Sequence, residues 1–417
     1  MSIKHIWLAI VIGTFFWAGC SVNSEKNPDP NFRVLNDEEL LNERLKESDT
    51  EVKVEQTATE LNKKASLRSF SLNLIAEVEP PVVNGEQVQA TMVSIIGNSA
   101  RAAVSYNVQG SDHLGAVDAL QVTSSNANSI RIRSGVAFSS AKANAVHYGT
   151  GGLWVALSSE DPELTGSNGF SAVKMFHVSG YTINDNSTNF GLPGFAANSV
   201  KEVDGRIYIT SGNNAGLTIL DSDLTEQIGY IDIPGARWVD VDENEAWIVV
   251  LGSNPENGMA TLYVINKNTL EIINEFPFEG ADTPEAKSTV ELRGELALIA
   301  AGKAGTIIMD INTGDIVATI PIPDPAEKGL SVDAVETNAV SADEEYIFIS
   351  NGEAGVYVAE ANMDLEAYNN GDHLTVDLIG YLMFDEFQSV NHVAYRNKTL
   401  FIASGLGGVK AVRLTRR

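Results

Sequence analysis

The sequence predicts an all-β protein, a seven-bladed β-propeller whose blades are four-stranded antiparallel sheets. The first observation is a segment that recurs seven times from about residue 90 to the C-terminus, at intervals of 42 to 54 residues. Each copy consists of a short apolar strand, a turn punctuated by glycine and a second apolar strand. The turns end at Gly115, Gly169, Gly216, Gly258, Gly305, Gly355 and Gly408. Strand-like units repeated at this period are typical of propeller blades.

The second observation is the alternation of apolar and polar residues inside each copy. The third copy shows it most clearly, with strands expected at residues 198–203, 206–210, 217–220 and 227–233. Turn residues, such as the pair Asp204 and Gly205, separate them. Alternation bounded by Gly, Asn and Asp predicts strands joined by hairpins.

The third observation concerns closure of the ring. The last copy supplies only three strands, at residues 392–395, 399–403 and 409–414, while a spare alternating strand stands at residues 70–78. We expect the spare strand to complete the seventh blade and cover an edge that would otherwise invite aggregation. Six or eight blades stay open, because the first two copies are the least regular.

The N-terminus has the pattern of an exported protein. Lys4 and His5 precede an apolar run over residues 6–18 that is short for a membrane span, and this order is typical of a signal peptide. The small pair at 18–19 stands directly before Cys20, the only cysteine. This segment resembles the lipobox of bacterial lipoproteins, although Trp17 stands where that pattern usually has an aliphatic residue.

The resemblance implies cleavage before Cys20 and a lipid on its thiol. Ser21, rather than Asp, resembles lipoproteins sent to the outer membrane, on its periplasmic or its outer side. The alternatives are an ordinary secretory signal or a short anchor. On this interpretation residues 1–19 are the signal peptide, 20–66 a tether and 67–417 the propeller.

The tether is expected to carry one short helix. Asn36 is the expected N-cap, acidic residues fill the first turn, and Leu40, Leu41 and Leu45 lie on one side. The remainder is charged and poor in large apolar residues, which favours an extended linker. The alternative is a helical arm packed on the propeller.

Composition limits the partners. A single cysteine excludes internal disulfides and thiolate metal sites. The net charge of −27 argues against nucleic acid and anionic lipid headgroups, so membrane contact is expected through the lipid anchor alone.

The repeats resemble the LVIVD-type and YVTN-type propeller repeats of bacterial surface proteins. The phrases that carry the resemblance are Ala-Gly-Leu-Thr-Ile-Leu-Asp at 215–221, Leu-Tyr-Val-Ile-Asn-Lys-Asn-Thr at 262–269 and Gly-Gly-Val-Lys-Ala-Val at 407–412. The resemblance implies a propeller in the cell envelope. It implies no reaction, because propellers host many unrelated functions.

Aligning the copies brings out a ring of polar residues at the start of each innermost strand, two positions before a valine. The ring comprises Thr91, Asn144, Asn198, Arg237, Ser288, Asn338 and Asn391. These residues and the glycine turns are expected at one mouth of the channel, where they could bind sugar hydroxyls, a carboxylate or water. Arg237 is the preferred contact for an anion. The alternative is structural, because Asn at a strand entry often caps a turn, and both roles can coexist.

No catalytic or metal-binding motif is found. Among the six histidines, His147 and His392 fall in innermost strands, and none pairs with another at ligand spacing. No cofactor is predicted, although the acidic loops at 160–163 and 242–245 leave calcium open. The tryptophans Trp154, Trp238 and Trp247 are expected to pack between blades.

The function expected from these features is non-catalytic binding or scaffolding of a protein or glycan partner at the cell envelope. One alternative is a polysaccharide hydrolase or lyase at the same mouth, which would need paired carboxylates. Asp282, Glu285 and Glu386 stand in the connecting loops, but no spacing singles out a pair. The other alternative is a purely structural spacer.

Overall fold

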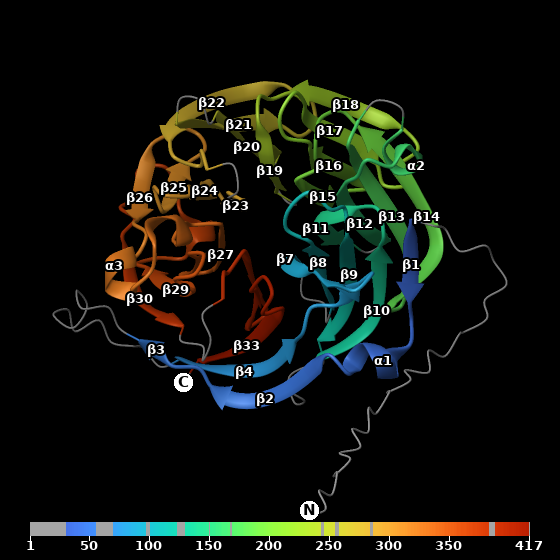
Figure 1. Cartoon of the computed structure of the whole chain (residues 1–417). Helices are drawn as coiled ribbons and strands as arrows, with labels where there is room; N and C mark the ends of the chain where they lie inside the picture. The colour runs from blue at the N-terminus through green and yellow to red at the C-terminus, as the bar shows by residue number, and fades with distance from the viewer. Residues whose placement is uncertain are drawn as a thin grey trace, which may run out of the picture.

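The protein folds into a ring of seven antiparallel sheets (Figure 1). This computed structural model describes residues 31–55, 70–96, 101–122, 130–149, 151–166, 169–242, 246–254, 258–283, 287–382 and 388–416. The signal peptide and Cys20 lie outside these ranges, as do Glu285 and Glu386.

The seven blades follow one another along the chain, each running from an innermost to an outermost strand. Blade 1 has β7 (Gln89–Ile95), β8 (Arg101–Asn107), β9 (Gly115–Val122) and β10 (Ile130–Phe138). Blade 2 has β11 (Lys142–Tyr148), β12 (Gly152–Ser158), β13 (Ser171–Ser179) and β14 (Thr182–Leu192). Blade 3 has β15 (Ser199–Val203), β16 (Arg206–Thr210), β17 (Gly216–Asp221) and β18 (Gln227–Asp232). Blade 4 has β19 (Ala236–Val241), β20 (Trp247–Asn254), β21 (Met259–Asn266) and β22 (Ile272–Glu279).

The remaining blades have the same order. Blade 5 has β23 (Val290–Arg293), β24 (Leu296–Ala300), β25 (Thr306–Asp310) and β26 (Ile316–Ile320). Blade 6 has β27 (Ala339–Asp343), β28 (Tyr346–Ser350), β29 (Val356–Ala361) and β30 (Val376–Leu382). Blade 7 has β31 (His392–Arg396), β32 (Thr399–Ala403), β33 (Val409–Arg416) and β4 (Phe70–Val78). Short elements join them: the hairpin β5 (Val82–Val83) and β6 (Glu86–Gln87), the helices α2 (Pro162–Thr165) and α3 (Pro325–Lys328), and the 3-10 turns η2 (Val332–Ala334) and η3 (Leu365–Ala367).

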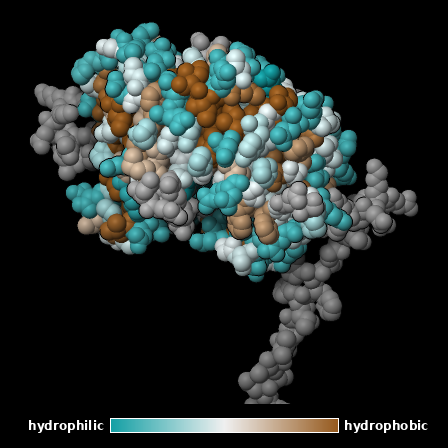
Figure 2. Space-filling model, turned by 90° about the horizontal axis from the view of Figure 1, so that it is seen from above, coloured by the Kyte–Doolittle hydropathy of each residue, from teal (hydrophilic) through white to brown (hydrophobic). Residues whose placement is uncertain are grey.

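The core lies between adjacent blades. One apolar cluster, for example, joins Tyr208 and Ile219 of blade 3 to Val239 and Ile248 of blade 4. Because the middle strands are covered on both faces, they read as continuous apolar runs: every residue of β24, β28 and β32 is buried. Outer strands alternate instead, and Ile228, Tyr230 and Ile273 of β18 and β22 are exposed. Figure 2 shows hydrophobic patches among hydrophilic side chains on one side of the ring.

The expected closure of the ring is confirmed. Strand β4 pairs antiparallel with β33, from Val78 opposite Val409 to Phe70 opposite Arg416. Leu72 and Ile75 of β4 are buried, so the closing strand contributes to the core as well as to the sheet. Blade 7 therefore takes three strands from the C-terminal end and one from near residue 70, and the seven-blade count holds.

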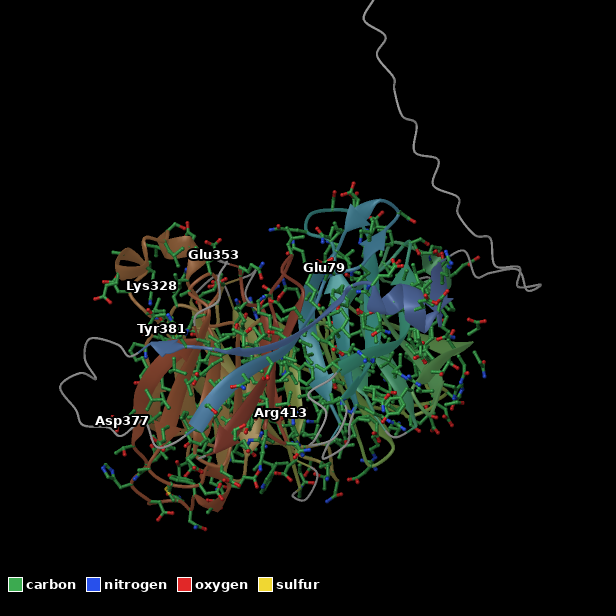
Figure 3. The ribbon with its side chains drawn as sticks, turned by 90° about the horizontal axis from the view of Figure 1, so that it is seen from below. Glu79, Lys328, Glu353, Asp377, Tyr381 and Arg413 are labelled. Carbon is green, nitrogen blue, oxygen red and sulfur yellow. The ribbon has the colours of Figure 1, made fainter. Side chains whose placement is uncertain are left out.

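The expected tether differs from the structure over residues 31–55. This segment forms β1 (Phe32–Leu35), the helix α1 (Glu38–Asn42), β2 (Leu45–Glu51) and β3 (Val54–Glu55). The three strands pair with the outermost strands of blades 1, 7 and 6 respectively, and Figure 3 shows β2 running along the outside of β4. The alternative, an arm packed on the propeller, describes this part of the chain, although the arm is mostly strand.

The helix also begins one residue later than expected. Asp37 is the N-cap and accepts a hydrogen bond from the Leu40 backbone N–H, whereas Asn36 donates to the backbone carbonyl of Ile183 in blade 2. The arm is further held by Arg44, whose guanidinium makes two bonds of 2.8 and 3.0 Å to the buried carboxylate of Asp118. The arm also buries Phe32, Leu41 and Val52 in the core, but these apolar residues are about ten positions apart, so its composition carries little apolar signal.

Candidate functional site

The mouth of the ring on the side of the glycine turns contains a cavity of about 930 Å³, here called the amide cavity. Six of the seven residues of the expected polar ring line it: Thr91, Asn144, Asn198, Arg237, Asn338 and Asn391. Further amides line it as well, namely Gln89, Asn107, Gln109, Asn213 and Asn214. The innermost strands that carry the ring surround the centre of the molecule in Figure 1.

Four asparagines of the ring join neighbouring blades. In each case Nδ2 donates to the backbone carbonyl of the residue that precedes the next blade's ring position. The bonds run from Asn144 to Ala197 at 2.9 Å, Asn198 to Ala236 at 3.3 Å, Asn338 to Val390 at 3.1 Å and Asn391 to Ala90 at 2.9 Å. We call these four residues the inter-blade belt. The last bond links blade 7 to blade 1 and so helps to close the ring.

The glycine turns reinforce the same joints. The first glycine of the turn forms a backbone bridge to the next blade in four places, namely Gly212 with Ala236, Gly302 with Thr337, Gly352 with Val390 and Gly405 with Ala90. These four glycines have φ between 55° and 72°, a region that favours glycine. The repeated Asn and Gly residues therefore have a structural role, because their contacts join neighbouring blades.

The belt leaves a second atom of each side chain for other partners. A carbonyl can only accept, so its position fixes Nδ2, and Oδ1 is the other end of the amide. The described residues offer no hydrogen-bond donor to Oδ1 of Asn198, Asn338 or Asn391, while Oδ1 of Asn144 accepts from Asn107 at 3.2 Å. Three acceptors thus remain in the wall of the amide cavity.

Ser288 is absent from the lining that the structure describes, and Lys287 stands there in its place. The backbone of Ser288 has φ of 50°, which turns this position out of the regular strand, and its side chain is fully buried. The sequence alignment placed Ser288 correctly, two residues before Val290 at the start of β23. It could not show that the backbone of Ser288 has a positive φ, which turns its side chain away from the cavity.

Lys287 crosses the channel. Its ammonium donates to the backbone carbonyl of Asn144 at 2.8 Å, which links blade 5 to blade 2. It lies 5.7 Å from the centre of the Trp238 ring, and that ring lies 5.7 Å from the imidazole of His392. Lys287 and Trp238 line the amide cavity, and Trp238 and His392 line the second cavity; we call these three side chains the floor.

Burial governs the charge state of the floor. Burial lowers the pKa of the Lys287 ammonium to about 8, and within the described ranges no carboxylate forms an ion pair with it. Burial, together with the positive charge of Lys287, lowers the pKa of His392 to about 3, so this imidazole is neutral near pH 7. The floor therefore carries one positive charge, on the half-buried Lys287, which favours the approach of an anion.

Arg237 is held in place by two short contacts. Nε donates to the Ser253 hydroxyl at 2.7 Å and Nη1 to the backbone carbonyl of Thr283 at 2.7 Å. Its guanidinium lines the same cavity as Lys287. The expected anion contact thus stands on a fixed side chain at the cavity wall.

Two aromatic rings on the rim were not foreseen. Phe170 and Phe195 line the amide cavity, are 44% and 68% exposed, and have ring centres 5.4 Å apart. Both stand in loops of blade 2 and its connection to blade 3, so no strand pattern marks them. Pairs of exposed aromatic rings are favoured at binding surfaces, where they supply apolar area at low entropic cost.

The second cavity, of about 380 Å³, opens among the later residues of the innermost strands. Its carboxylates are engaged: Asp240 pairs with Lys201 at 2.8 Å, and Arg293 pairs with Glu291 at 2.5 Å and Glu366 at 3.4 Å. His147 and His392 line this cavity, as their place in innermost strands suggested. Burial, followed by the charge of Lys201, lowers the pKa of His147 to about 3.

The acidic loops give no ion site in the part of the chain that is described. No group of three or more His, Cys, Asp or Glu side chains gathers there at metal-binding distance. In the first loop Asp161 is the N-cap of α2 and accepts from the Glu163 N–H. The alternative of a carboxylate pair at the amide cavity likewise finds no acid among the described lining residues.

Comparison with known proteins shows the fold and no family. No protein-family model and no curated protein matches the chain. Among solved structures, a hydrazine synthase from Kuenenia stuttgartiensis is 12% identical with a TM-score of 0.53, over 80% of this chain and 99% of that one. A computationally designed protein, Ika8, is 9% identical with a TM-score of 0.45 over the same shares, too low to carry an argument. The first likeness agrees with the propeller architecture, because that protein contains a propeller. In addition, none of the helices described here is long and apolar enough to cross a membrane.

Proposed function

We propose that this protein is a cell-envelope lipoprotein, anchored through Cys20 in the outer membrane, whose propeller is a non-catalytic binding module for a protein or glycan partner. The observation that carries the proposal is the lining of the amide cavity. It combines three free amide acceptors with two cationic side chains and two exposed aromatic rings. Convergent polar groups beside apolar surface are what small ligand sites share.

The attachment point sets how far the propeller would stand from the membrane. Asn31 is fixed against blade 2, where its amide donates to Glu163 at 3.3 Å and accepts from Ser140 at 3.1 Å. Eleven residues from Cys20 to residue 30 span at most about 40 Å. A lipid on Cys20 would therefore hold the outer rim of blades 1 and 2 close to the bilayer.

The anchor and the binding function need separate tests. Metabolic labelling with an alkyne fatty acid tests the anchor, and we expect label on the wild type and none on Cys20→Ser. For binding, the full chain in detergent is used to capture partners from envelope extract beside Arg237→Ala, with mass spectrometry of bound protein and glycan. A partner held by the wild type and lost by a folded Arg237→Ala supports the proposal. No partner held by the wild type above an empty matrix contradicts it.

A purely structural spacer is the second candidate, because the inter-blade belt gives the repeated Asn a role in the ring itself. The spacer predicts that changes at the cavity wall alter melting temperature only. Phe195→Ala tests this, since Phe195 is 68% exposed and contacts Phe170 rather than the core. Loss of capture at an unchanged melting temperature excludes the spacer.

A further inference from the structure

We propose that the ligand of the amide cavity is an acidic saccharide, a chain of sugar rings whose carboxylate lies between Lys287 and Arg237. In this arrangement the amide oxygens of Asn198, Asn338 and Asn391 accept from sugar hydroxyls, and one ring packs on Phe170 and Phe195. The inference rests on the proposed binding function and names its ligand class.

The charge of the cavity is opposite to that of the chain. The protein carries 55 acidic and 28 basic residues, yet the described lining of the amide cavity holds two cations and no carboxylate. A local positive potential on an acidic protein directs anions to this cavity, because the rest of the surface repels them. The same lining argues against a cationic ligand.

Lys287 is the side chain that most favours an anionic ligand. Its ammonium is held by one backbone carbonyl and one aromatic ring, with no carboxylate of the described residues beside it. A half-buried cation such as Lys287 is stabilised when an anion enters, and its lowered pKa has the same physical cause, the loss of solvation. Arg237 stands at the wall of the same cavity and can share that anion.

The amides distinguish a sugar from an acidic peptide. The free atoms at Asn198, Asn338 and Asn391 are acceptors, because each Nδ2 is committed to a backbone carbonyl. The carboxylates of an acidic peptide only accept at neutral pH, and each of its residues offers one backbone N–H donor, whereas each ring of a sugar chain offers several hydroxyl donors. The two half-buried cations and the surrounding acceptors therefore fit one molecule that carries both a carboxylate and hydroxyls.

The aromatic pair and the size of the cavity agree with a sugar chain. Phe170 and Phe195 offer an apolar face at the rim, against which the C–H face of a sugar ring can pack. A volume of about 930 Å³ lies near the upper end of the range of about 300–1,000 Å³ seen for small-ligand sites. The cavity therefore has room for more than one ring.

Titration calorimetry with matched probes tests the inference on the full chain. The probes are trisaccharides of galacturonic, glucuronic and mannuronic acid, the methyl ester of each, and a peptide of three glutamates. We expect at least one trisaccharide acid to bind, its methyl ester to bind at least about tenfold more weakly, and the peptide to bind more weakly still. Binding of no trisaccharide acid overturns the inference, as does equal affinity for acid and ester or for acid and peptide.

Variants locate the binding. Lys287→Met and Arg237→Gln should each weaken binding of the acid at least about tenfold and leave affinity for the ester nearly unchanged. Phe195→Ala should weaken acid and ester alike. The matched controls are Lys53→Met and Ile273→Ala, both exposed and outside the cavity, which should bind like the wild type.

Different results would contradict the acidic-saccharide ligand and the binding module on which it rests. If Lys287→Met does not fold, Arg237→Gln and the comparison of acid with ester still decide the ligand class. Capture of a protein or of a neutral glycan from envelope extract, with no affinity for any uronic acid, overturns the acidic saccharide and keeps the binding module. Absence of any captured partner contradicts the binding module itself.

Discussion

Replacing Asn391 tests whether the inter-blade belt holds the ring together. Nδ2 of Asn391 donates to the carbonyl of Ala90 at 2.9 Å, across the joint between blade 7 and blade 1, and Ala90 is fully buried. Asn391→Ala removes this donor and leaves a buried acceptor unsatisfied, which costs about 1–3 kcal/mol of unfolding free energy.

The expected change in melting temperature follows from the size of the ring. An unfolding entropy of about 2 cal/mol/K per residue over roughly 350 residues gives about 0.7 kcal/mol/K. The loss therefore lowers the melting temperature by about 1.5–4 °C. Differential scanning calorimetry resolves a shift of this size.

The isosteric variant Asn391→Asp tests the same contact more specifically. Asn391→Asp places a carboxylate oxygen against the Ala90 carbonyl, so two acceptors face each other at the distance where a bond stood. We expect a larger drop than for alanine at pH 7. The deficit should shrink as the pH falls, because the folded state favours the protonated carboxyl, whose pKa is thereby raised.

Asn213 provides the control, since it is exposed in the same cavity and no hydrogen bond of its side chain is found among the described residues. Asn213→Ala and Asn213→Asp should melt like the wild type. The belt would be refuted if Asn391→Ala melted with the wild type, or if Asn391→Asp melted no lower than Asn391→Ala.

Three further outcomes are expected. Arg44→Met should lower the unfolding free energy by about 3–5 kcal/mol in chemical denaturation, because it leaves Asp118, whose side chain is 3% exposed, without its cation. Gly408→Ala should lower the melting temperature more than Gly371→Ala, since both positions have positive φ but only the first would bring Cβ to 2.0 Å from a carbonyl of the closing strand β4. Affinity for the acidic trisaccharide should fall as the pH rises through about 8, where Lys287 loses its proton and His392 is already neutral, and Lys287→Met should show no such fall in calorimetric titrations.

The ring of blades was predictable because the middle strands are buried in the same way from blade to blade. Both faces of a middle strand are buried, so β24, β28 and β32 appear in the sequence as apolar runs bounded by turn residues. The closing strand β4 was predictable for the same reason, since its buried residues Leu72, Ala76 and Val78 belong to one alternating set.

The arm over residues 31–55 was predicted as a tether because its stabilisation leaves little trace in composition. β2 buries almost none of its side chains and is held by backbone pairing with β4. The ion pair of Arg44 with Asp118 joins residues 74 positions apart, and no local pattern links them. Edge strands that add to an existing sheet are thus poorly visible in a sequence.

The floor of the cavity was missed for a different reason. Lys287 reaches across the ring to blade 2, a contact set by the diameter of the channel and by the reversed backbone at Ser288. The periodic pattern had correctly brought Asn144, Asn198 and Arg237 to one mouth, because repeated positions on innermost strands must share a level. Of the two cations of the site, Arg237 stands at a repeated position, and only Lys287 lies outside the repeat.

In the inter-blade belt, one end of an asparagine side chain stabilises the ring and the other end is available for recognition. In Asn198, Asn338 and Asn391 the Nδ2 atom joins two blades, while Oδ1 stays available in the cavity wall. Alanine at these positions removes both atoms, so a variant that loses its ligand has also lost a joint of the ring. Phe195 and Asn213 line the same cavity and join no blades, and their substitution reports on recognition alone. Repeated positions in this fold therefore supply both the joints between blades and part of the cavity wall, while Lys287, Phe170 and Phe195 outside the repeat supply the rest of the wall.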